Sequence, residues 1–194
     1  MEILKAKRVS GKVVRQIVKE IKEGKVLIFP TDTVYGLIAA ATNKKAVDRI
    51  FQIKKRNKRK PIPIFVRDLK QAKELAEINK VQEVLLKIAW PGKMTFVFWR
   101  KRREKLYGVD KKSIALRIPD YPLVSKVLKK ISLPLTGTSA NISTKAPTTK
   151  IKEVLKEFKG QKYQPDSVVD AGNLKPAGPS TVIDLRQGFK ILRK

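Results

Sequence analysis

Five polar clusters hold the residues whose chemistry could give this chain an activity; they lie at 30–36, 54–61, 117–119, 136–141 and 178–184. They combine fixed Lys and Arg cations with Ser, Thr and Asn side chains, a set that suits a phosphate-rich ligand. Phosphoryl and nucleotidyl transfer need little covalent help from a protein, because positioning and charge neutralisation supply most of the catalysis. Together the clusters therefore predict a phosphate-binding site.

Each cluster also has a purely structural explanation when it is taken alone. The PTDTVYG segment at 30–36 could be a turn whose Thr and Asp side chains bond their own backbone. Lys54 and Arg56 could complement the dipole of a helix end, and Ser139 with Asn141 could cap the next element. Only the set as a whole favours a ligand site.

The residue types and motifs that the chain lacks exclude several kinds of site. Cysteine and histidine are absent, which excludes disulfides, iron–sulfur clusters, zinc–thiolate sites and Ser-His-Asp triads. The sequence contains neither GxxxxGK[ST] nor GxGxxG, so it supports neither a P-loop nor a Rossmann dinucleotide site. A bound ATP would need a different phosphate-binding segment.

The charge of the chain favours polyanionic partners. Its 45 basic and 17 acidic residues give a net charge of +28, which concentrates nucleotides or RNA around a protein, although a lysine-rich solvated surface explains it equally well. Basic runs at 54–60 and 100–105 motivate an alternative hypothesis, a tRNA- or double-stranded-RNA-binding protein without enzymatic activity. Because no apolar stretch approaches the roughly 20 residues of a membrane span and the N-terminus lacks a signal segment, we expect a cytoplasmic protein that does not use a membrane.

Apolar periodicity predicts the elements that must position the clusters. Helices are expected over 14–21, 47–54, 69–90, 124–131 and 151–158, and strands over 25–30, 62–66, 94–100, 113–118, 167–170, 180–185 and 189–193. Residues 101–112 are expected to form an exposed connection. Several strands follow one another without an intervening helix, so the fold class is α/β (α+β), with a mixed sheet covered by helices.

Six motifs occur in the order seen across the YrdC/TsaC family of threonylcarbamoyl-AMP synthases, and the chain resembles that family over nearly its whole length. They are PTDTVYGL at 30–37, IKKR at 53–56, WPGKMTFV at 90–97, LRIPDYP at 116–122, TSAN at 138–141 and PSTVID at 179–184. The most diagnostic pair is KxR followed far downstream by SxN, here Lys54 and Arg56 with Ser139 and Asn141.

The resemblance implies a single YrdC-like domain over residues 1–194, without the C-terminal domain of longer relatives, built on a twisted mixed sheet with an electropositive concave cavity. It implies synthesis of L-threonylcarbamoyladenylate from L-threonine, bicarbonate or CO2, and ATP, with release of pyrophosphate. Mg²⁺ would be bound mainly through the polyphosphate, with no metal ligands from protein side chains. A transferase complex would then pass the threonylcarbamoyl group to tRNA.

The resemblance also implies roles for individual residues. Thr33 and Arg117 would contact threonine, with Tyr35 lining its pocket. Lys54, Arg56, Ser139 and Asn141 would hold the phosphates and the carbamate, with Lys54 and Arg56 as the catalytic cations. Ser180 and Thr181 would help to seat the nucleotide.

Four positions depart from the family pattern, and one segment is a candidate cover. Phe65 and Tyr121 stand where many relatives carry His, Lys55 stands where Gly is common, and Lys93 replaces a usual Pro. The polar segment 142–150, ISTKAPTTK, is expected to form a mobile cover over the site.

Overall fold

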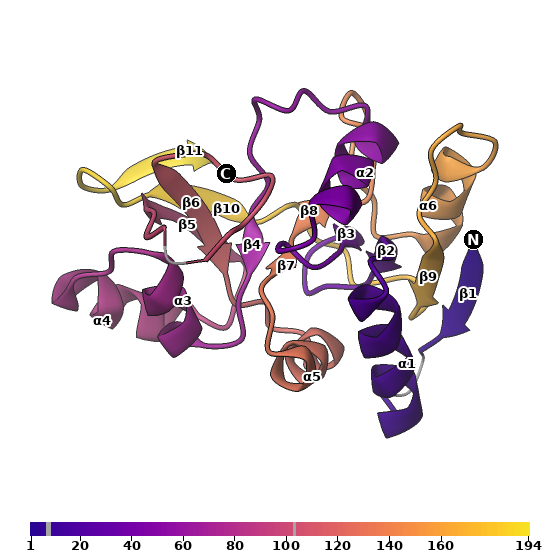
Figure 1. Ribbon diagram of the computed structural model, residues 1–194, viewed down its shortest axis with the longest axis horizontal. Helices are drawn as coiled ribbons and strands as arrows, with labels where there is room; N and C mark the ends of the chain where they lie inside the picture. The colour runs from indigo at the N-terminus through magenta and orange to yellow at the C-terminus, as the bar shows by residue number, and fades with distance from the viewer. Residues whose placement is uncertain (7–8, 103) are drawn as a thin grey trace.

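The computed structural model describes residues 1–6, 9–102 and 104–194, whose strands form two mixed sheets side by side (Figure 1). The five-stranded sheet has the order β1 (Glu2–Lys5), β9 (Ser167–Asp170), β2 (Leu27–Phe29), β3 (Gly36–Ile38) and β8 (Thr138–Ser139). Its first three strands are parallel neighbours, and β3 pairs antiparallel with both β2 and β8.

The six-stranded sheet has the order β11 (Lys190–Arg193), β10 (Thr181–Asp184), β5 (Met94–Trp99), β6 (Ser113–Arg117), β4 (Ile64–Phe65) and β7 (Leu135–Thr136). The pairs β10–β5 and β4–β6 are parallel, and the other three pairs are antiparallel. The expected mixed α/β class is confirmed, but the strands divide over two sheets instead of one.

Both faces of the five-stranded sheet are covered by helices. Helices α1 (Gly11–Lys22) and α5 (Pro122–Ile131) pack on one face, against Leu27 and Phe29, whereas α2 (Lys44–Lys54) and α6 (Ile151–Phe158) pack on the other, against Val26 and Ile28. Side chains alternate between the faces of a strand, so the unbroken apolar run VLIF supplies both cores.

The six-stranded sheet is covered differently. Helices α3 (Leu69–Leu75) and α4 (Lys80–Ala89) pack on one face only, against a core that includes Phe96, Phe98 and Leu116. The opposite face holds the alternate side chains of the same strands, and this is the face toward which the polar clusters converge.

One expected helix, over 69–90, is wrong. The chain leaves the helical conformation at Ala76, which forms an isolated bridge with Arg100, and Asn79 starts α4 with a capping box. Most of the apolar residues whose spacing predicted this helix point outward: Val81, Val84 and Ile88 are 80%, 60% and 82% exposed, whereas Leu85 is partly buried against the core and Leu86 is 1% exposed. Periodicity predicted the helix but not the face that it buries.

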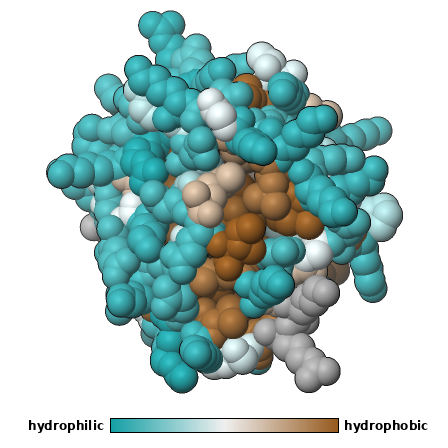
Figure 2. Space-filling model, turned by 90° about the vertical axis from the view of Figure 1, so that its right-hand side faces the viewer, coloured by the Kyte–Doolittle hydropathy of each residue, from teal (hydrophilic) through white to brown (hydrophobic). Residues whose placement is uncertain are grey.

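The side of the molecule that bears edge strand β1 is mostly hydrophilic, with a band of apolar residues running across it (Figure 2). None of the helices within the described ranges is long and apolar enough to cross a bilayer.

Candidate active site

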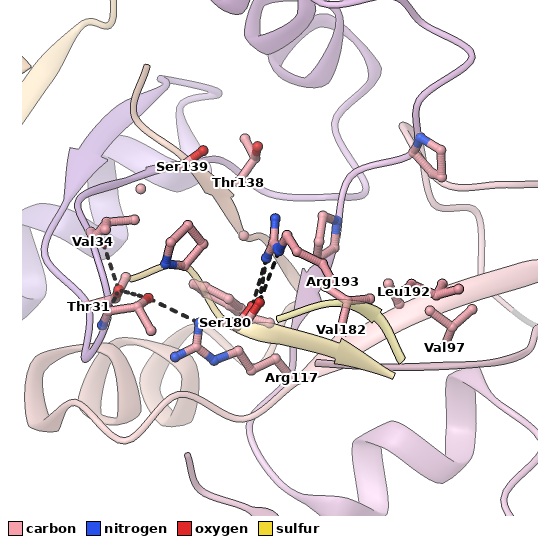
Figure 3. Close-up of a pocket in the computed structure, with 18 of the residues that line it drawn as sticks. Thr31, Val34, Val97, Arg117, Thr138, Ser139, Ser180, Val182, Leu192 and Arg193 are labelled. Carbon is pink, nitrogen blue, oxygen red and sulfur yellow. Dashed lines mark hydrogen bonds between the residues drawn. The ribbon is translucent and has the colours of Figure 1, made fainter. Parts of the chain in front are cut away.

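A cavity of about 290 Å³ lies where the two sheets meet (Figure 3). It is near the lower end of the range of about 300–1,000 Å³ that is usual for ligand pockets. Its polar lining comes from all five clusters identified in the sequence together with the last strand, and comprises Thr31, Thr33, Arg56, Arg117, Thr138, Ser139, Ser180 and Arg193. Stretches of chain far apart in the sequence therefore meet in one hollow.

Strand alternation explains which side chains reach the cavity. On β5 and β6, Phe96 and Leu116 face the core under α3 and α4, so Val97 and Arg117 face the cavity. In the same way, Ser180 and Val182 line the cavity, while Ile183 lies in the core.

Arg117 is the most buried cation of the cavity, with a side chain only 4% exposed. Its Nη2 donates to Asp32 Oδ1 at 2.6 Å, its Nη1 donates to Thr33 Oγ1 at 3.2 Å, and its Nε donates to the Gly92 carbonyl at 2.9 Å. Burial lowers the pKa of Arg117, and the Asp32 carboxylate opposes that shift. The guanidinium thus remains charged and is held from three sides.

Arg56 and Arg193 are held by neutral groups. Arg56 donates to the carbonyls of Lys60 and Pro61, and Arg193 donates to the carbonyl and hydroxyl of Ser180. Burial lowers the pKa of both side chains, and the positive charge of Arg193 lowers the pKa of Arg56 further. Because nearby like charges raise each other's energy, an anion placed between them would relieve that cost.

Lys54 lies behind the cavity wall and is 1% exposed. Its Nζ donates to the carbonyls of Ser139 and Asn141 and to the Asn141 side-chain oxygen. Ser139 Oγ donates to that same side-chain oxygen at 2.6 Å. Among the described residues that line the cavity, the KxR and SxN motifs are represented by Arg56 and Ser139, while Lys54 and Asn141 tie the turn together from inside.

Tyr35 and Thr181 also lie outside the cavity lining found in the described ranges. Tyr35 is fully buried in the core under α2 and α6, where its hydroxyl donates to the Gly172 carbonyl at 2.6 Å. Thr181 alternates with Ser180, and its backbone N–H donates to the Lys93 carbonyl.

The expected cover, 142–150, is tied down at several points. Asn141 Nδ2 donates to the Lys145 carbonyl, Thr148 Oγ1 donates to Glu153, and the Leu174 N–H donates to the Thr149 carbonyl. The basic run 100–105 lies in the connection between β5 and β6; one of its residues, 103, lies outside the described residues.

Two of the departures from the family pattern acquire a structural context. Phe65 lines the cavity with its ring 5.8 Å from the Arg117 guanidinium, and a Cβ at Gly137 would lie 2.3 Å from that ring. Lys55 is the C-cap of α2 at φ 49° and ψ 42°, a left-handed conformation that glycine adopts most readily. Its side chain is exposed.

Sequence reasoning missed Arg193, Asp32 and Thr31. Asp32 and Thr31 stand inside a recognised cluster, but the sequence does not show which member pairs with Arg117. Arg193 is the last residue of an expected strand, and only the pairing of Val182 with Arg193 brings it to Ser180 and the cavity.

Comparisons with known proteins agree with the geometry. Residues 19–194 match the family model Sua5_yciO_yrdC, described as "Telomere recombination". A relative from Methanocaldococcus jannaschii is 38% identical over 174 residues, which are 90% of this chain and 81% of the relative. The threonylcarbamoyl-AMP synthase of Pyrococcus abyssi is 36% identical over 176 residues, 89% of this chain but only 50% of that protein.

Solved structures resemble the whole chain. The structure of Pyrococcus abyssi Sua5 complexed with L-threonine matches 99% of this chain and 56% of its own, with a TM-score of 0.88 and 33% identity. The chain therefore spans little more than half of that protein. Escherichia coli YciO matches with a TM-score of 0.87 over 100% of this chain and 94% of its own, at 23% identity, which is a likeness of fold.

Proposed function

Because this chain belongs to the Sua5/YciO/YrdC family, we propose that it is a threonylcarbamoyl-AMP synthase that converts L-threonine, bicarbonate or CO2, and ATP into L-threonylcarbamoyladenylate and pyrophosphate. The observation that carries the proposal is the meeting of Arg56, Arg117 and Arg193 with the Ser139 and Ser180 hydroxyls in one cavity. Its residues 1–194 would act as one domain, which the match of the threonine-bound Sua5 structure to 99% of the chain supports.

In the proposed site, Arg117 and Thr33 bind threonine. The planar guanidinium can hold a carboxylate through two parallel hydrogen bonds, and Thr33 Oγ1, 3.2 Å from Arg117 Nη1, lies beside it. A polar partner for the threonine hydroxyl would discriminate against analogues that lack it, because the protein group would otherwise be left unpaired.

Arg56, Arg193, Ser139 and Ser180 bind the triphosphate in this proposal. The carbamate forms when the threonine amine attacks CO2 and loses a proton. A carbamate oxygen then attacks the α-phosphorus of ATP, and the bond to the β-phosphate oxygen breaks to release pyrophosphate. The carbamate and ATP are both anionic, so fixed guanidinium charges offset their repulsion and stabilise the charge that moves onto the leaving group.

Lys54, Asn141, Tyr35 and Thr181 support the site from behind. The first two hold the turn that presents Ser139, and Tyr35 and Thr181 anchor the segments on either side of the cavity. Mg²⁺ would be held mainly by the polyphosphate, since this ion usually keeps several waters and binds through substrate phosphates.

The product would pass to a threonylcarbamoyl-transferase complex that modifies tRNA, a cytoplasmic process. The alternative is a tRNA- or double-stranded-RNA-binding protein of the same fold without synthase activity, which the net charge of +28 favours.

Pyrophosphate release from ATP tests the proposal, measured with and without threonine and bicarbonate. We expect release only when both are present, and a mass-spectrometric product that contains threonine, one carbon dioxide unit and AMP. Release that does not depend on threonine would contradict the proposal. Absence of release together with salt-sensitive RNA binding would favour the alternative.

A further inference from the structure

Both carboxylate oxygens of Asp32, at the edge of the cavity, accept hydrogen bonds. Its Oδ1 accepts the 2.6 Å hydrogen bond from Arg117, and its Oδ2 accepts the backbone N–H of Asp120 at 3.1 Å. The side chain is 8% exposed. Asp32 lies between β2 and β3 of the five-stranded sheet, whereas Arg117 ends β6 of the other sheet, so the ion pair joins the two halves of the site.

The contacts of Arg117 leave part of its guanidinium available. A guanidinium has five N–H bonds, and among the described residues Arg117 directs three of them to Gly92, Thr33 and Asp32. One N–H remains on each terminal nitrogen. Two such N–H bonds can donate to one carboxylate. The three contacts already made set the orientation of the guanidinium plane.

Asp32 also changes the charge of the cavity. Among the ion pairs of the described residues, Arg117 has a carboxylate partner, whereas Arg56 and Arg193 have none. The carboxylate therefore offsets the charge of Arg117, whereas the charges of Arg56 and Arg193 are not offset in this way. A zwitterionic amino acid suits the Arg117–Asp32 pair, and a polyphosphate suits Arg56 and Arg193.

We propose, on the premise that the cavity is the synthase site, that Asp32 is a positioning residue for threonine binding. It holds Arg117 in the orientation that receives the amino-acid carboxylate, and it offsets the Arg117 charge so that phosphate groups bind at Arg56 and Arg193 instead. Asp32 stays in place when threonine binds, because both of its oxygens are anchored and Arg117 has further N–H bonds to offer.

The test compares the wild-type protein with Asp32→Asn and the matched control Asp120→Asn. The control removes the same charge from an exposed side chain that lies close by in the fold but makes no hydrogen bond to Arg117. We expect Asp32→Asn to raise the KM for threonine about 10- to 100-fold and to leave the KM for ATP nearly unchanged. Isothermal titration with threonine alone should show the same loss of affinity without turnover.

A second measurement separates positioning from general damage to the fold. Inorganic phosphate should compete with threonine in Asp32→Asn, where Arg117 has lost its neutralising partner, but not in the wild type or in Asp120→Asn. A structural defect would lower affinity without creating a new phosphate competitor.

Several results would overturn the inference. A threonine KM that falls in Asp32→Asn would mean that Asp32 is a placeholder displaced by the substrate, and equal values in both variants would mean that only net charge matters. If Asp32→Asn does not fold, Asp32→Glu carries the test: a raised threonine KM without phosphate competition is expected, and a wild-type KM overturns the inference. A wild type that neither binds threonine nor releases pyrophosphate contradicts the proposed function instead.

Discussion

Lys54 and Asn141 are joined by two hydrogen bonds from one ammonium group, which lies 2.8 Å from the Asn141 carbonyl oxygen and 3.1 Å from its side-chain oxygen. The ammonium also donates to the Ser139 carbonyl, so one buried cation connects the end of α2 to the turn after β8. The two diagnostic motifs of the sequence therefore bind each other before they bind any ligand.

This contact predicts that Lys54→Ala loses stability as well as activity. Removing the ammonium takes one hydrogen bond from each of three oxygens and leaves the Asn141 carbonyl without the donor described for it, so we expect the free energy of unfolding to fall by about 2–4 kcal/mol in urea denaturation. Lys45→Ala on the exposed face of α2 is the control and should change it by less than about 0.5 kcal/mol. Equal stability of the two variants would mean that Lys54 contributes to ligand binding and not to stability.

The burial of Lys54 also predicts a pH dependence of stability. Burial and the charge of Arg56 lower the pKa of Lys54 from 10.5 to about 7, against the opposing effect of Glu157. Above the folded pKa the unfolded chain binds a proton that the folded chain has released, so this group makes stability rise with pH from about 7 toward 10.5.

Urea denaturation at pH 7, 8 and 9 should therefore show a rise in the wild type that is smaller in Lys54→Met. The methionine variant has no titrating group at this position and retains an unbranched side chain. Parallel profiles for the two proteins would contradict the assigned pKa.

Arg193→Ala should weaken nucleotide binding selectively. Arg193 donates to Ser180 and lines the cavity without a carboxylate partner among the described ion pairs. Loss of a charge-assisted contact predicts an increase in the KM for ATP of about 10- to 100-fold, with little change for threonine. Lys194→Ala, which removes the adjacent exposed charge, should behave like the wild type. An unchanged ATP KM in Arg193→Ala would remove Arg193 from the site.

The outward face of α4 should tolerate polar substitution. Val84 is 60% exposed, so we expect Val84→Ser to change the free energy of unfolding by less than about 0.5 kcal/mol. Leu86→Ala, on the opposite face of α4 and 1% exposed, should cost about 2–5 kcal/mol. A larger loss of stability in Val84→Ser than in Leu86→Ala, measured by thermal or urea denaturation, would mean that α4 buries the face that bears Val84.

Lys55→Gly should stabilise the protein. At φ 49° a side chain clashes with its own backbone, and glycine relieves a cost of about 1 kcal/mol there while losing more entropy on folding. We expect a net gain of about 0.5 kcal/mol in urea denaturation. A loss of stability would mean that the Lys55 side chain makes a contact that outweighs the backbone strain.

Most secondary-structure elements could be predicted because their signals are local. The helical spacing of apolar residues locates α1, α5 and α6, and β-branched runs locate β2, β9 and β10, each to within a few residues. Short strands such as β3 and β8 escaped prediction, because two or three residues hold too little pattern to distinguish a strand from a turn. The split of 69–90 escaped for a different reason, since a contact with Arg100 ends the helix at Ala76.

By itself, the sequence determined the chemical inventory of this protein: cations, hydroxyls and amides in ordered motifs, with neither histidine nor cysteine to support other chemistry. Only the tertiary structure decided which members of each motif face the cavity. Strand alternation and cross-sheet pairing turn Arg117 and Ser180 toward it, bring in Arg193, and direct Lys54 and Tyr35 into the interior. Those outcomes depend on contacts between residues far apart in the chain, which local patterns do not encode.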